Sequence, residues 1–286
     1  MDFPQDLNKL YHYSSPAGLM GIVRSKSLWF TNIHYQNDIE EYTYAYKLTK
    51  QIVDSEYQGF GYNDYINGAV TAVFTFSLSE NDDQLSQWRG YCPTGGFSFS
   101  FDSEQLEEVI TDNGLTLQKC IYDKQEQIAY IKAKIIGFTP AEWAKALEEH
   151  EQGNSSRYYN CHRSIREMPK ALAQAAAIMK HEKFGEEAEW RLIKTYFDVR
   201  ADIFTLNGNQ TLFFKRDTIK FREAKDILIP YVEIPLVKNK EADPLKLSTI
   251  VVGPGPRQDL ALQSCTYLGH DLHAITKVSL VPYRNW

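Results

Sequence analysis

Residues 183–196, KFGEEAEWRLIKTY, contain a predicted β-strand that carries an unusual row of charged side chains. Side chains in a β-strand repeat on one face every second residue, which places Glu187, Glu189 and Arg191 in one row. Burying two carboxylates and a guanidinium is costly unless they are paired. The pattern therefore indicates either a structural ion-pair network, the commoner case for a strand taken alone, or a functional site.

The composition indicates a globular protein rich in aromatic side chains, with 18 Tyr, 15 Phe and 5 Trp among 286 residues. The net charge of −6 gives no support for non-specific binding to nucleic acid. The four cysteines form no CxxC pair, which favours reduced thiols in a cytosolic protein over a disulfide framework or a zinc site. We expect neither a signal peptide nor membrane association, because a basic and apolar leader and a span-length apolar run are both missing.

Strand-like and helix-like segments are mixed along the chain without a regular strand–helix–strand alternation, which predicts an α+β fold. Helix starts are predicted at Ser15, at Asp102 and at Asp38, where Glu41 completes a capping box. The segments 204–215 and 219–223 are expected to form a hairpin with its turn at 207–209. Alternating or apolar runs predict the other strands at 10–15, 28–31, 69–79, 97–101, 115–122, 187–196, 227–236, 247–252 and 274–282.

The longest helical stretch, at about 123–183, lies between two strand-like segments. Its apolar residues recur at helical spacing, and no linker rich in proline, glycine or serine brackets it. We therefore expect a single domain over 1–286, with a helical insertion that borders the site rather than builds the sheet.

Several common catalytic motifs are absent from the sequence: Walker A, GxGxxG, HExxH, the EF-hand loop and GxSxG. His270 and His273 have the wrong spacing for one helical face and no nearby cysteine, so no metal site is expected there. Cys161 and His162 are neighbours in sequence only, which gives no reason to pair them as nucleophile and base. We predict no metal site in this chain.

What remains is a set of polar residues spread along the chain. His12 lies at the end of the first predicted strand, Ser77 and Ser79 belong to the hydroxyl face of a central strand, and Glu187 and Glu189 lie on a late strand. A polar face on a central strand often lines a cleft, although it can equally face water. His12 alone is more often a core histidine than a ligand, but the combined arrangement reverses that preference.

Sequence blocks along nearly the whole chain resemble the bacterial domain of unknown function 2971 family. They are LYHYSS (10–15), LWFTN (28–32), NDIEE (37–41), FSLSENDDQLSQWRGY (76–91), GGFSFSFD (95–102), FGEEAEWRLI (184–193), IVVGP (250–254) and SLVPYR (279–284). The order of an early strand histidine, a central polar strand and a late strand glutamate is in turn similar to the His–Tyr–Glu arrangement of ADP-ribosyltransferases.

This resemblance implies an ADP-ribosyltransferase-like domain with a split mixed or antiparallel sheet and with NAD as substrate. Glu187 and Glu189 would be the catalytic carboxylates. The acceptor would be a protein or a nucleic acid, and the implied setting is a toxin–antitoxin pair or a phage-defence system with its own partner. The residues expected to hold NAD are His12, Tyr13, Ser14, Asn37, Ser77, Ser79, Tyr91 and Arg191.

These residue types suit cleavage of the nicotinamide–ribose bond, because a carboxylate can stabilise the oxocarbenium-like charge that develops only in the transition state. One glutamate would act on that charge, and the other would orient or deprotonate the acceptor. Two alternatives stay open. One is a non-catalytic module of the same fold that binds a nucleotide or a partner; the other is a metal-dependent nuclease that uses Asp38, Glu40 and Glu187.

Overall fold

A ten-stranded sheet of mixed strand direction is the main element of the structure. The computed structural model describes residues 6–36, 39–60, 71–197, 202–206, 209–213, 219–224 and 226–282. The strand order is β12-β11-β4-β1-β3-β2-β10-β9, with β6 on the other edge of β3 and β5 beside β6. The predicted α+β class is confirmed: the strand pairs of the sheet are antiparallel except β11 with β12, which is parallel.

The strand bounds follow the alternating segments of the sequence. The strands of the sheet are β1 (Tyr11–Ser14), β2 (Ser27–Asn32), β3 (Thr71–Ser79), β4 (Phe97–Phe101), β5 (Thr116–Lys119), β6 (Glu189–Phe197), β9 (Lys220–Ala224), β10 (Ile227–Pro235), β11 (Leu247–Val252) and β12 (Ile275–Val278). A separate antiparallel ribbon consists of β7 (Asp202–Leu206) and β8 (Asn209–Phe213). Of the predicted turn, residues 207 and 208 lie outside the described residues, and Asn209 begins β8. The expectation that 219–223 joins this hairpin is wrong, because that segment pairs with β10.

The larger hydrophobic core lies on one face of the sheet. Phe74, Phe76 and Leu78 alternate along β3 and all point into it, as the two-residue period of a strand requires. Burying side chains of this size stabilises the fold by about 1.5–3 kcal/mol each. The helices that pack on this core are α1 (Pro16–Ser25), α5 (Ser103–Asp112) and α9 (Gln258–Asp271).

Two of the predicted helix starts are confirmed by their capping bonds. The Ser15 hydroxyl accepts from the Gly18 backbone N–H at 3.2 Å at the start of α1, where Pro16 occupies the first helical position. The Asp102 carboxylate accepts from the Gln105 backbone N–H at 3.0 Å at the start of α5. The third predicted start, at Asp38, lies outside the described residues, and α2 is described over Ile39–Glu56.

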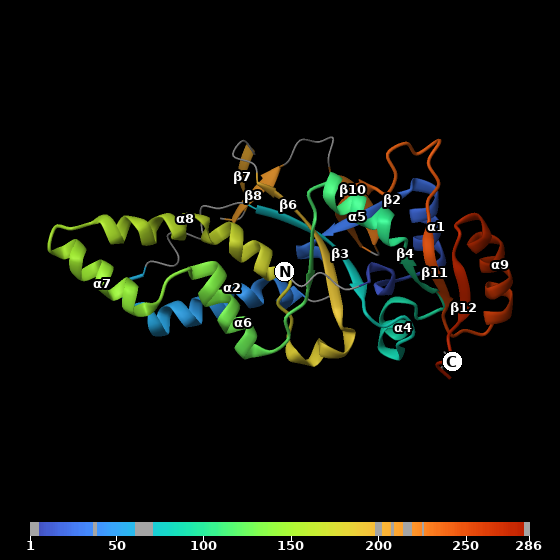
Figure 1. Ribbon diagram of the computed structural model, residues 1–286, viewed down its shortest axis with the longest axis horizontal. Coiled ribbons are helices and arrows are strands. Elements are labelled where there is room, and N and C mark those ends of the chain that lie inside the picture. Colours follow the sequence, from blue (N-terminus) through green and yellow to red (C-terminus); the bar gives the residue numbers. More distant parts are fainter. Residues whose placement is uncertain are drawn as a thin grey trace.

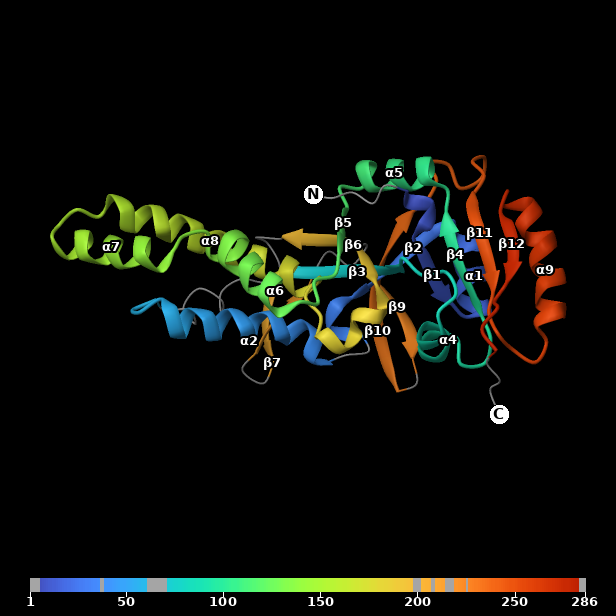
Figure 2. The ribbon, with the colours of Figure 1, turned by 60° about the horizontal axis from the view of Figure 1, so that its bottom comes forward.

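The segment 123–183 is helical over most of its length and contributes no named strand in its described residues. It contains α6 (Lys124–Tyr130), a π-helical turn (Ile131–Ile136), α7 (Pro140–Glu151) and α8 (Ser156–Ala176). With α2 these helices enclose a second core and form one end of the elongated molecule, while α9 lies at the other end (Figure 1, Figure 2). None of the described helices combines the length and apolar composition needed to cross a membrane.

The sheet is split beside β3. One edge of β3 pairs with β6 along its whole length. The opposite edge is shared by two strands, since β1 pairs at Ser79 and β2 pairs at Thr75 and Phe74. Between these contacts, the Ser77 carbonyl oxygen is bonded not by a strand but by the His12 ring, whose Nδ1 lies 2.9 Å away. The sheet is therefore interrupted between β1 and β2, and the His12 ring lies at this interruption.

Candidate functional site

The opening of the charged strand differs from the prediction. Glu187 was expected on the same strand face as Glu189, but it ends a short 3₁₀ helix, η4 (Glu182–Glu187), and β6 begins only at Glu189. Ala188 between them has φ +43°, in the left-handed region that non-glycine residues rarely adopt. The turn is held by the Ser79 hydroxyl, which donates to the Glu187 carbonyl oxygen at 2.8 Å. The position of the Glu187 side chain is therefore set by this turn and not by the alternation of side chains along β6.

Glu189 belongs to a buried ion-pair network. Its carboxylate accepts from Arg191 Nε at 2.8 Å and from Nη2 at 3.1 Å, and Lys180 Nζ lies 2.7 Å away. Arg191 Nη1 also donates to the Ala177 carbonyl oxygen at 2.8 Å. Burial alone would raise the pKa of Glu189, but the charges of Arg191 and Lys180 outweigh it and lower the pKa to about 2. These contacts give Glu189 a structural role and leave its oxygens little freedom to act on a ligand.

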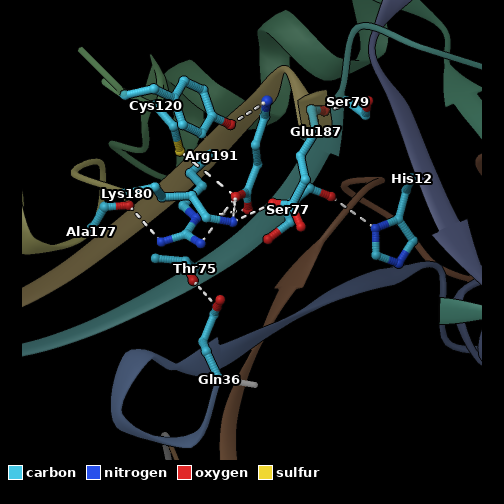
Figure 3. A network of polar contacts seen from close by, with 12 residues as sticks. His12, Gln36, Thr75, Ser77, Ser79, Cys120, Ala177, Lys180, Glu187 and Arg191 are labelled. Atoms are coloured by element: carbon cyan, nitrogen blue, oxygen red, sulfur yellow. Dashed lines mark hydrogen bonds and ion pairs between the residues drawn. The ribbon is translucent and has the colours of Figure 1, made fainter. Parts of the chain in front are cut away.

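The three residues of this network come from segments that the fold brings together. Glu189 and Arg191 are two residues apart on β6 and share a face opposite the large core. Lys180 follows α8, where its backbone N–H donates to the Ile121 carbonyl oxygen at 3.1 Å and its own carbonyl oxygen accepts from Gln127 Nε2 at 2.7 Å. The end of the helical segment is thereby fixed beside the sheet (Figure 3).

Glu187 is placed differently from Glu189. Its side chain is 17% exposed and pairs with Lys180. It lines a cavity of about 330 Å³, and Glu189 does not. Among the described residues that line this cavity, Glu187 is the sole carboxylate. The cavity volume lies within the range of small-molecule sites.

The cavity opens through the split in the sheet and combines charged, aromatic and hydroxyl groups. Its cations are Lys180, Arg191 and Arg222. Its aromatic side chains are Trp29, Tyr35, Phe76, Tyr91 and Phe184, of which Tyr35, Tyr91 and Phe184 are exposed. Its hydroxyls are those of Ser14, Thr31, Thr75 and Ser77, and Thr75 accepts a hydrogen bond from Gln36 Nε2 (Figure 3). Such a lining suits a ligand that has both planar rings and polar groups.

His12 lies on the cavity wall with its ring fixed on two sides. The ring stacks on Phe76 at a centroid distance of 4.2 Å and meets Phe99 edge-on at 5.5 Å. With the ring neutral, Nδ1–H donates to the Ser77 carbonyl oxygen, and Nε2, which points away from Ser77 in Figure 3, is the acceptor nitrogen. Burial lowers the pKa of His12 to about 4, an effect opposed by the Ser77 bond and reinforced by the positive charge of Arg222.

The His12 ring should accordingly stay neutral at pH 7. Folding favours the neutral form, so the contribution of His12 to stability is present above pH 6.5 and declines as the pH falls toward 4. A proton NMR titration should give His12 a midpoint near 4. A His12 midpoint at the ordinary histidine value of 6.5 would contradict the described packing.

The other residues predicted to hold NAD are divided between the cavity and its surroundings. Ser14, Ser77, Tyr91 and Arg191 line it together with His12. Tyr13 does not line it: its hydroxyl donates to the Asn81 carbonyl oxygen and accepts from the Gln84 backbone N–H, and its ring packs on Trp88. Ser79 is also directed elsewhere, since its hydroxyl holds the Glu187 turn. Asn37 lies outside the described residues.

Several cavity residues were missed by reasoning from the sequence. Lys180 lies in the last part of a predicted helical segment that gives no periodic signal for a site, and Phe184 directly follows that segment. Trp29 and Thr31 lie in an apolar strand that reads as core, and Arg222 lies in a short edge strand. Only the tertiary arrangement of β2, β9 and η4 brings these side chains to one cavity.

The geometry thus defines an α+β protein with a ligand-sized cavity at a split in its sheet. Residues 87–192, from α4 (Leu85–Tyr91) into β6, match the model of a family described as a protein of unknown function, DUF2971. The match includes Lys180, Glu187 and Arg191 but not the His12 strand. No curated protein and no solved structure matches the chain.

The described residues contain no group of three or more His, Cys, Asp or Glu side chains that could hold a metal ion. Of the residues named for the nuclease alternative, Asp38 lies outside this part of the chain, and Glu187 faces Lys180. The cysteines Cys92, Cys120, Cys161 and Cys265 are all buried, and none forms a disulfide.

Proposed function

We propose that the protein transfers ADP-ribose from NAD, with the cavity between β1, β3 and η4 as its active site. The observation that carries this proposal is the position of His12 and Glu187 on the walls of one cavity of about 330 Å³, although they are far apart in the sequence. This arrangement also supports the resemblance to the His–Tyr–Glu ADP-ribosyltransferases, whose early histidine and late glutamate serve one NAD site.

Glu187 is the carboxylate proposed to act on the reacting centre. The bond between nicotinamide and the ribose breaks, its electrons leave with the nicotinamide nitrogen, and positive charge develops on the ribose. A fixed carboxylate stabilises that charge in the transition state. Lys180 pairs with both Glu187 and Glu189, and it would therefore hold Glu187 in a defined position.

Glu189 is reassigned from catalysis to the support of the site. Its carboxylate is occupied by Arg191 and Lys180, and its side chain is 7% exposed. Of the two carboxylates expected to be catalytic, the proposal therefore keeps Glu187 alone. The acceptor, a protein or nucleic-acid group, would be deprotonated by a residue other than Glu189 or would react without a base. A role in toxicity or phage defence remains a prediction from the resemblance.

The cavity chemistry also offers places for the rest of the dinucleotide. His12 Nε2 can accept a hydrogen bond from a ribose hydroxyl, because Nδ1 is held by Ser77. Tyr91, Tyr35 and Phe184 present exposed rings on which nicotinamide or adenine can stack. A carboxylate, a fixed imidazole and aromatic faces together suit NAD better than a purely apolar or purely anionic ligand.

The melting temperature should rise as the NAD concentration is increased, since a ligand of the folded state stabilises it by mass action. His12→Ala should reduce the shift, because loss of one hydrogen bond to the ribose costs on the order of 1–3 kcal/mol. His270→Ala is the matched control, because His270 is exposed on α9 and does not line the cavity. An equal shift in both variants would remove His12 from the NAD site.

One observation favours a second candidate, a module that binds the nucleotide without cleaving it. The only carboxylate described on the cavity wall is already paired with Lys180, which could neutralise its charge. This candidate predicts the same melting-temperature shift with NAD but no release of nicotinamide. Measuring nicotinamide release from NAD therefore distinguishes the two proposals.

A further inference from the structure

Arg222 is a charged group of the cavity that the chemistry above does not use. It extends from β9, is half-buried, and donates from Nη2 to the Thr31 hydroxyl on β2 at 2.9 Å. Within the part of the chain that the structure describes, no carboxylate forms an ion pair with it. The other two cations of the cavity differ in this respect, because Lys180 and Arg191 both pair with Glu189.

A partly buried guanidinium without an anion is energetically costly, and burial lowers the pKa of Arg222. Arginine nevertheless stays charged at neutral pH. Its planar fork has five N–H donors, and the bond to Thr31 uses a single one of them. The positive charge is felt inside the cavity, since it contributes to the lowered pKa of His12. The cavity therefore contains a positive group that an incoming anion would neutralise.

We propose that Arg222 and Thr31 form the subsite for the phosphate groups of the nucleotide. Arginine binds phosphate through two parallel N–H···O bonds, and these charge-assisted bonds are stronger than neutral ones. The Thr31 hydroxyl can donate to a phosphate oxygen while it still accepts from Arg222. Trp29 and Tyr35 line the same cavity and supply rings beside the subsite for the nucleoside part of the ligand.

This inference deepens the proposed function and rests on it only for the identity of the nucleotide as NAD. It specifies that the site selects ligands by their phosphates, so ADP should bind and adenosine should bind much more weakly. The selectivity belongs to binding and does not require that any bond be cleaved.

The test compares the dissociation constants of ADP and adenosine, measured by isothermal titration calorimetry on the full chain. We expect ADP to bind at least tenfold more tightly than adenosine. Arg222→Gln should bring the two ligands to within about threefold of each other, since the loss of a charged hydrogen bond changes affinity by tenfold or more. Arg222→Lys should give an intermediate ratio, because it keeps the charge and loses the fork.

Lys220→Gln is the matched control, since Lys220 lies two residues earlier on β9, pairs with Glu233 and does not line the cavity. It should keep the wild-type preference for ADP. The inference is overturned if wild-type protein binds adenosine as tightly as ADP, if it binds neither at millimolar concentration, or if folded Arg222→Gln keeps the preference. Absence of nicotinamide release from NAD would refute the transferase proposal alone and would leave an Arg222-dependent preference for ADP in place.

Discussion

Replacement of Arg191 by methionine is expected to lower the free energy of unfolding by about 3–5 kcal/mol, the range found when one partner of a buried ion pair is removed. The Glu189 carboxylate would remain buried while losing both of its bonds to the guanidinium. The Ala177 carbonyl oxygen would also lose its donor. Urea unfolding followed by tryptophan fluorescence measures this change directly.

The control for this substitution is Lys50→Met, which breaks the ion pair of Lys50 with Asp54 on the surface of α2. Both side chains of that pair are exposed, and such helix pairs contribute only about 0.3–0.5 kcal/mol. If Arg191→Met were as stable as Lys50→Met, the buried network would have no part in holding the fold.

The same network predicts how stability responds to acid. The pKa of Glu189 is lowered from 4.5 to about 2 on folding, so folding favours the ionised carboxylate. Its contribution is fully present above pH 4.5 and is lost as the pH falls through 2, and it amounts to about 3 kcal/mol. Glu189→Gln should be less stable at neutral pH and should show a flatter decline between these values. An unchanged acid profile would contradict this account.

Glu187→Gln is the second substitution with a large expected effect, this time on turnover. Removal of an aimed electrostatic group typically lowers the rate by a hundredfold or more, and glutamine keeps the shape of the side chain. The unfolding free energy should fall less than in Arg191→Met, because Glu187 is partly exposed and Lys180 keeps Glu189 as a partner. Steady-state nicotinamide release from NAD, normalised to folded protein, measures the effect.

Glu186→Gln is the matched control for this second substitution. Glu186 precedes Glu187 in the same 3₁₀ turn, but its residue is exposed and does not line the cavity. It should release nicotinamide at the wild-type rate. A similar loss of rate in both variants would attribute the effect to the turn rather than to the Glu187 carboxylate.

The sequence predicted correctly those features that depend on interactions between residues a few positions apart. The Ser15 and Asp102 caps, the apolar row along β3 and the pairing of Glu189 with Arg191 all follow from short-range spacing. The predicted strand position of Glu187 failed, because alternation over a few residues does not reveal a 3₁₀ turn that tertiary hydrogen bonds hold in place.

The site was less predictable than the elements that carry it. Tyr13 was expected to hold NAD with His12, but its hydroxyl donates to the Asn81 carbonyl oxygen and its ring packs on Trp88, so it does not line this cavity. Lys180 and Arg222 reach the cavity only because α8 ends beside β6 and β9 lies on the same sheet as β2. Such contacts depend on strand order, which no spacing within one segment specifies.

The central claim is that this cavity cleaves NAD, and the most direct measurement is mass spectrometry of nicotinamide formed from NAD by the purified protein. The incubation is made with and without cell lysate, which supplies an acceptor if water does not serve as one. The account predicts nicotinamide in at least one of these incubations with wild-type protein and its loss in Glu187→Gln. No nicotinamide from folded wild-type protein in either incubation would contradict it.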